Sequence, residues 1–183
     1  MKILVAALAA GALAVATNAQ AADVSMPMMP GPVVVAVPAP SPAFDWSRFY
    51  VGAIGGVYLA SDPLEFYSGR VTGIVGKGFT IGQRLVVGGE VQAGLYDFSD
   101  PAFEMYGLGR AGVLLGERVL VFTLGGIGWD SGNWALVGGG GVEVALGANL
   151  SLRGETMLYW GFGDGLAPGY VWLSGGLAWR FGR

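Results

Sequence analysis

Apolar and polar residues alternate along most of the chain from Trp46 onward. In the clearest stretch, residues 85–96, Val87 and Val91 fall on one face, and Glu90 and Gln92 fall on the other. A repeat of two residues is typical of β-strands whose two faces meet different surroundings. The alternation recurs over the ranges 49–59, 69–79, 85–96, 105–115, 119–129, 134–146, 150–160 and 171–181. The pattern therefore predicts an all-β fold of eight strands.

The length and hydrophobicity of these strands suit a membrane. Strands of ten or eleven residues, tilted near 40°, cover roughly 25 Å of bilayer thickness. The chain is 53% hydrophobic, yet glycine pairs such as Gly55-Gly56 and Gly88-Gly89 interrupt its later apolar runs. A hydrophobic chain without helical spans crosses a bilayer only as a closed barrel, because every backbone polar group must be paired. We predict an eight-stranded antiparallel up-and-down transmembrane β-barrel with its polar face inward and its apolar face toward lipid.

The first 43 residues have a different character. Lys2 precedes an apolar run from Ile3 to Ala16, and small residues close the segment near Ala21, which is the pattern of a cleaved Sec-type signal peptide. Residues 22–43 hold most of the nine prolines and predict an extended linker. We therefore expect a signal peptide at 1–21, a Pro-rich periplasmic linker at 22–43 and a barrel at 44–183, in the outer membrane of a Gram-negative bacterium.

The connections between the predicted strands alternate in length. Short links fall at 80–84, 116–118 and 147–149, and the other set falls at 60–68, 97–104, 130–133 and 161–169. Short periplasmic turns and longer external loops are typical of such barrels. The external set is acidic and contains no Lys or Arg; its acids are Asp62, Glu65, Asp97, Asp100, Glu104, Asp130 and Asp164. Divalent cations that bridge these acids to lipopolysaccharide phosphates are one hypothesis, and freely solvated acids are the other.

Five charged residues fall on the predicted inward face: Glu90, Arg110, Glu143, Arg153 and Glu155. An eight-stranded barrel has an interior just wide enough for side chains. Buried charges must be paired and hydrogen-bonded. We predict a structural charge network that fills the lumen; an ion path or a catalytic carboxylate pair is the alternative.

Composition excludes several chemistries. The chain has no cysteine and no histidine, which excludes disulfides, Cys/His zinc sites and Ser-His-Asp or Cys-His catalysis. A formal net charge of −3 argues against binding nucleic acid. The G-x-G-x-x-G match at 107–112 is followed by a predicted strand rather than the helix that a dinucleotide site requires. We expect no catalytic site, no cofactor and no metal centre.

Several glycine-rich segments carry a family resemblance. They are Phe44-Asp-Trp-Ser-Arg-Phe-Tyr-Val-Gly-Ala53, Val86-Val-Gly-Gly-Glu-Val91, Tyr106-Gly-Leu-Gly-Arg-Ala-Gly112, Gly139-Gly-Gly-Val-Glu-Val144 and Leu150-Ser-Leu-Arg-Gly-Glu155. From Phe44 to Phe181 the chain resembles the small outer-membrane proteins of alphaproteobacteria, the opacity-like surface barrels. The resemblance implies eight strands, both termini in the periplasm and no enzymatic role. The chain departs from the family in its short loops and in Gly182-Arg183, which follow the terminal aromatic residue that the assembly machinery reads.

These observations favour a non-enzymatic structural barrel that stabilises the cell envelope and presents short acidic loops outside. The alternatives are a narrow porin-like channel, a soluble lipocalin-like binder, an adhesin, and a lipid-modifying enzyme, of which the enzyme is least favoured because such small barrels typically use histidine. The expected partners are outer-membrane lipid, lipopolysaccharide and, during insertion, the assembly machinery. The oligomeric state stays open.

Overall fold

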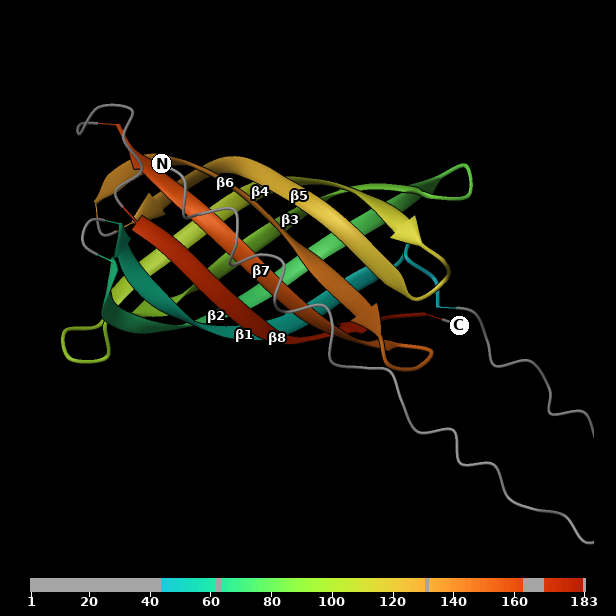
Figure 1. Ribbon diagram of the computed structural model, residues 1–183, viewed down its shortest axis with the longest axis horizontal. Coiled ribbons are helices and arrows are strands. Elements are labelled where there is room, and N and C mark those ends of the chain that lie inside the picture. Colours follow the sequence, from blue (N-terminus) through green and yellow to red (C-terminus); the bar gives the residue numbers. More distant parts are fainter. Residues whose placement is uncertain (1–43, 62–63, 131, 163–169, 183) are drawn as a thin grey trace, which may run out of the picture. The chain divides into compact units, whose positions relative to one another are not determined.

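The fold is a closed antiparallel β-barrel, given by a computed structural model that describes residues 44–61, 64–130, 132–162 and 170–182. Its strands are β1 (Phe49–Ser61), β2 (Leu64–Ile81), β3 (Leu85–Tyr96), β4 (Ala102–Leu115), β5 (Val119–Asp130), β6 (Asn133–Ala145), β7 (Leu150–Gly161) and β8 (Tyr170–Arg180). Each strand pairs with its neighbours in sequence, and β1 also pairs with β8, which closes the sheet (Figure 1). The predicted fold class is confirmed.

Two predicted segments, the signal peptide at 1–21 and the linker at 22–43, lie outside the described residues. Among the residues that are described, no helix is both long and apolar enough to span a membrane.

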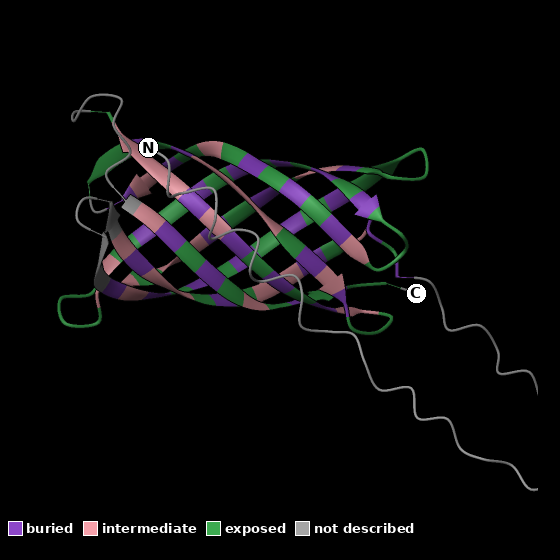
Figure 2. Ribbon diagram, viewed as in Figure 1, coloured by how far each residue is buried: buried purple, intermediate pink, exposed green. Residues whose placement is uncertain are grey.

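The two faces of the sheet differ sharply in polarity. Burial alternates residue by residue along the whole of β4, and the same banding runs around the barrel (Figure 2). Val91 and Leu173 on the outer face are 50% and 57% exposed, whereas Arg153 and Glu143 on the inner face are at most 1% exposed. A soluble lipocalin-like barrel requires the opposite arrangement, with its apolar side chains inside. The structure thus has an apolar outside and a charged inside.

Three tight turns join β2 to β3, β4 to β5 and β6 to β7, at the end of the barrel where the described chain finishes (Figure 1). Gly82 and Gly116 in these turns have φ values of 63° and 71°, which glycine adopts without strain. The three predicted short links therefore occur where they were expected.

The opposite end of the barrel is more regular than the sequence suggested. The predicted loop at 60–68 is mostly strand, because β1 continues to Ser61, β2 begins at Leu64, and the ladder between them persists after a register shift at Tyr58/Leu59. The sequence analysis treated this acidic stretch as a loop because its alternation broke off there, but the strand-forming residues on either side extend the pairing. Similarly, β4 begins at Ala102 rather than at Met105.

The rule that the apolar face meets lipid predicts Leu120, Phe122 and Leu124 on the outer face of residues 119–129, and for this strand the prediction is wrong. Leu120, Phe122 and Leu124 of β5 are buried inside the barrel, whereas Thr123 faces outward and donates a hydrogen bond from Oγ1 to Ala111 O at 3.3 Å. The inward positions of β6 opposite them include Gly139 and Gly141. A Cβ at Gly141 would lie 2.9 Å from Phe122 Cζ. Strand β5 therefore supplies the bulk that β6 lacks, and its larger apolar residues point inward.

Candidate functional site

The interior of the barrel holds positive and negative side chains in nearly equal numbers. Arg70, Arg110, Arg153, Arg180, Glu90, Glu104, Glu143, Glu155 and Asp130 are all buried. Ion pairs among four arginines and four glutamates divide them into three groups. Charges removed from water need such partners, because desolvation without pairing is very costly.

The first group links opposite walls of the barrel. Arg153 of β7 donates to both carboxylate oxygens of Glu90 on β3, at 2.5 and 2.9 Å. The same guanidinium donates to Glu155 at 2.8 Å. Gln92 Nε2 bridges the two carboxylates, at 2.8 Å from Glu90 and 3.1 Å from Glu155. Bidentate, charge-assisted hydrogen bonds of this kind are strong and directional, so they hold β3 and β7 at a fixed separation.

The second group lies nearer the tight-turn end, since Arg180 is the last residue of β8. Glu143 of β6 is fully buried and accepts hydrogen bonds from Arg110 Nη2, from Arg180 Nη2 at 2.8 Å and from Ser151 Oγ at 2.5 Å. Two guanidinium groups therefore share one carboxylate, and this group carries a net charge of +1.

A tyrosine connects the first two groups. The Tyr50 hydroxyl donates to Glu90 Oε2 at 2.5 Å and accepts from Arg110 Nη1 at 3.4 Å. The Phe122 ring also lies against both groups, 3.9 Å from Arg110 Cζ and 4.8 Å from Arg153 Cζ. The +1 group thus faces a −1 group, Glu90–Arg153–Glu155, across Tyr50, and their charges offset one another.

The third group lies toward the long-loop end and corrects two expectations. Glu104 and Asp130 were expected in external loops, but they are the third residue of β4 and the last residue of β5, they pair in register, and both are buried. Arg70 Nε lies 3.1 Å from Glu104 Oε1, and Thr72 Oγ1 donates to the same oxygen at 2.9 Å. Arg70 Cζ also lies 4.1 Å over the Trp172 ring. The strands run further than predicted, so both acids point inward, and Glu104 pairs with Arg70.

The remaining predicted external acids divide into two sets. Asp97 and Asp100 lie in the connection between β3 and β4; Asp97 is partly exposed with a φ of 53°, and Asp100 is exposed. The backbone of Glu65 belongs to β2, whereas Asp62 and Asp164 lie outside the described residues.

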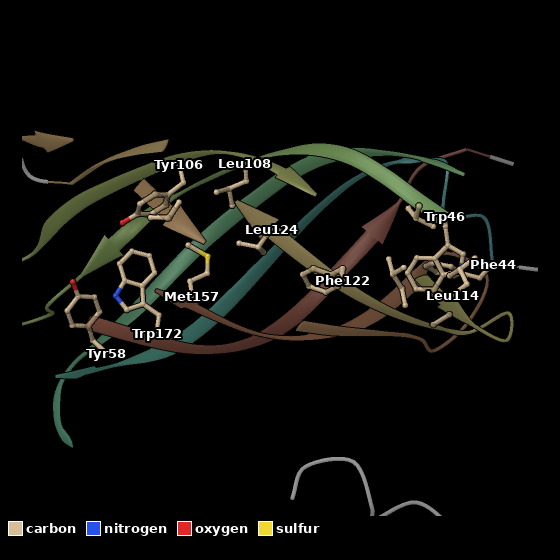
Figure 3. Close-up of a cluster of buried hydrophobic side chains, with 14 residues drawn as sticks. Phe44, Trp46, Tyr58, Tyr106, Leu108, Leu114, Phe122, Leu124, Met157 and Trp172 are labelled. Atoms are coloured by element: carbon tan, nitrogen blue, oxygen red, sulfur yellow. The ribbon is translucent and has the colours of Figure 1, made fainter. Parts of the chain in front are cut away.

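The tight-turn end is filled by residues 44–48, which we call the N-terminal plug. Phe44 and Trp46 are buried, and Figure 3 shows them beside Leu114, far from the Trp172 end of the same apolar cluster. Trp46 Nε1 donates to the backbone oxygen of Glu117 at 3.1 Å. Arg48 Nη1 donates to Asn149 Oδ1 at 3.2 Å and to the backbone oxygen of residue 182 at 2.5 Å. These bonds fasten the plug to two turns and to the end of the described chain.

The sequence analysis did not predict the plug as part of the interior. Arg70 and Arg180 fall on the polar, inward faces of their strands, as buried residues should, but they were left out of the predicted charge network. One signal was present: Phe44 and Trp46 share the even-numbered register of Tyr50, which points inward. Among the described residues there is no cluster of three or more side chains suited to hold a metal ion.

Comparison with known proteins shows the fold alone. No family model matches the chain, and no curated protein matches it either. The N-terminal β-barrel domain of Pseudomonas aeruginosa OprF is 11% identical with a TM-score of 0.56, over 74% of this chain and 98% of that one. Ail, the attachment invasion locus protein of Yersinia pestis, is 12% identical with a TM-score of 0.52, over 73% and 97%. A de novo designed transmembrane β-barrel is 13% identical with a TM-score of 0.53, over 76% and 99%.

This chain therefore has the architecture of the eight-stranded barrels of outer membranes. At these identities, function has to be argued from the chain's own residues.

Proposed function

We propose that this chain is a non-enzymatic structural β-barrel of the outer membrane, which stabilises the cell envelope and presents short acidic loops outside. One observation carries the proposal: the barrel is apolar on its outer surface and ion-paired within. Exposed apolar residues such as Phe79, Val91 and Leu177 recur around the wall. A surface of this kind is stable in lipid and not in water.

The filled interior favours a structural role over a channel. The first two charge groups span the lumen between β3 and β7 and between β4, β6 and β8. The N-terminal plug occupies the tight-turn end. Since an eight-stranded barrel has room for little beyond side chains, ions would have to break several buried pairs to pass.

The absence of enzymatic activity belongs to the same proposal. The buried carboxylates Glu90, Glu143 and Glu155 each accept from an arginine, which holds them as charge partners rather than as proton carriers. The lumen arrangement is therefore better suited to rigidity than to general acid–base chemistry.

The acidic residues of the external loops suggest which molecules the barrel contacts outside. Asp97 and Asp100 present carboxylates in the β3–β4 loop, where divalent cations would bridge them to lipopolysaccharide phosphates. We propose outer-membrane lipid and lipopolysaccharide as the surroundings of the mature barrel. Export through the signal peptide and insertion by the assembly machinery complete this proposal.

The first experiment compares boiled and unboiled outer-membrane fractions by gel electrophoresis, with the soluble periplasmic fraction as the control. A band that shifts on boiling and fractionates with the outer membrane supports an inserted barrel. An unshifted periplasmic band would overturn the proposal.

Planar-bilayer recordings of the purified protein then test the filled lumen. Steady discrete openings would indicate a narrow channel instead of a structural role, whereas a membrane that conducts no current supports the structural role.

A further inference from the structure

A small, partly enclosed cavity lies at the boundary between the N-terminal plug and the charge network. Trp46, Tyr50, Gly78, Val86, Arg110 and Arg180 line it. The space open to the centre of a water-sized sphere is about 10 Å³, which is room for roughly one water or one small ion.

The two arginines at this cavity have more donors than acceptors. Within the part of the chain that the structure describes, Nε of Arg110 and both Nε and Nη1 of Arg180 are buried without a hydrogen-bond partner. Both arginines pair with the same carboxylate, that of Glu143. A buried charged donor that lacks an acceptor is among the costliest defects in a folded interior.

Aromatic rings compensate only part of this charge. Arg180 Cζ lies 5.0, 4.9 and 4.7 Å from the ring centroids of Phe44, Trp46 and Tyr50. Ring faces attract a cation through their quadrupole. They offer no lone pair, however, to the N–H groups that lie in the plane of the guanidinium.

We propose that this cavity binds one small monovalent anion of the size of chloride, held by Arg110 and Arg180 beneath the plug. An anion would supply the acceptor that the unpartnered N–H groups of Arg110 and Arg180 lack. A water molecule would bring two further O–H donors to two arginines that already have more donors than acceptors. The small volume excludes gluconate. Such an anion lies between β4, β8 and the plug, so its binding fastens the plug in place.

The test uses the purified, folded barrel in detergent, with chloride exchanged for gluconate at constant ionic strength. Because a ligand that binds only the folded state stabilises it by mass action, each tenfold rise in chloride above its Kd lowers the unfolding equilibrium constant about tenfold. The gel shift between the folded and unfolded bands measures that constant. An unfolding constant that is equal in chloride and in gluconate would overturn the proposal.

Two substitutions sharpen this result. Glu143→Gln removes the competing carboxylate and should shift the chloride dependence to lower concentration. Arg70→Gln is the matched control, because Arg70 pairs with Glu104 and does not line the cavity; its chloride dependence should equal that of the unsubstituted chain. If the chloride dependence of unfolding shifts equally in both variants, the effect is a general one of salt, and a site at Arg110 and Arg180 is refuted.

Diffraction from crystals of the unsubstituted chain grown in bromide tests the same site without any variant. An anomalous peak between Arg110 and Arg180 supports the anion, whereas an ordinary water with no anomalous signal contradicts it.

Discussion

Substitution of Glu143 by glutamine should be among the most destabilising single changes in this barrel. Within the described residues, Glu143 is the only carboxylate that pairs with Arg110 and Arg180, and it is 0% exposed. Removing one member of a buried ion pair costs about 3–5 kcal/mol. Since this change removes the one carboxylate that Arg110 and Arg180 share, we expect a loss near the upper end, about 5 kcal/mol. That is a large part of the roughly 5–15 kcal/mol that stabilises a typical folded protein.

The assay is urea unfolding of the lipid-inserted barrel in halide-free buffer, followed by the boiled-to-unboiled gel shift. With a slope of about 1–3 kcal/mol per molar urea, the midpoint should fall by about 2 M or more. Glu117→Gln makes the same chemical change on an exposed turn residue, where we expect at most about 0.5 kcal/mol. Arg110→Met should cost less in the Glu143→Gln background than in the unsubstituted chain. Equal midpoints for Glu143→Gln and Glu117→Gln would refute the account of the charge network.

Three further perturbations test the plug and the outer wall. Trp46→Ala empties a buried site and removes the bond to a turn carbonyl, so unfolding titrations should show a loss of about 3–5 kcal/mol; a loss below 1 kcal/mol would contradict a packed plug. Gly78→Ala would place a Cβ 2.3 Å from the backbone oxygen of Trp46, whereas a Cβ at Gly107 meets nothing within 4 Å; limited trypsin digestion should therefore detect a displaced plug in the first variant only. Val91→Arg, in the middle of β3 on the apolar face, should cost about 2–4 kcal/mol in lipid, and Ile81→Arg at the end of β2 about 0–1 kcal/mol; similar losses in both variants would argue against a membrane-embedded wall.

The strands and their order were predictable because alternation is a local property. Each strand carries its own period of two, and a closed up-and-down barrel pairs strands in the order of the chain. The partners of the inward charges were not predictable in the same way. Arg153 binds Glu90 from four strands away, and such a contact depends on the shear and closure of the whole barrel.

Local sequence cues also explain the errors. Glu104 lies beside a Ser-Asp-Pro turn signal, and its charge suggested solvent, although its even register with Tyr106 and Leu108 places it inward. The reversed face of β5 depends on the glycines opposite Phe122. The outward position of Thr123 and the inward position of Phe122 can be explained only when the neighbouring strand is known.

The position of Arg180 has a consequence for how the barrel is built. Its partners are Glu143 and the rings of Phe44 and Trp46, so the residue that completes the last strand also holds the segment that precedes the first. Contacts between such distant positions form late in folding, because the loop entropy of the whole intervening chain must be overcome. The interior therefore reaches its final packing only when β1 and β8 have met, and any unzipping of that one seam would pull the plug away from Arg180.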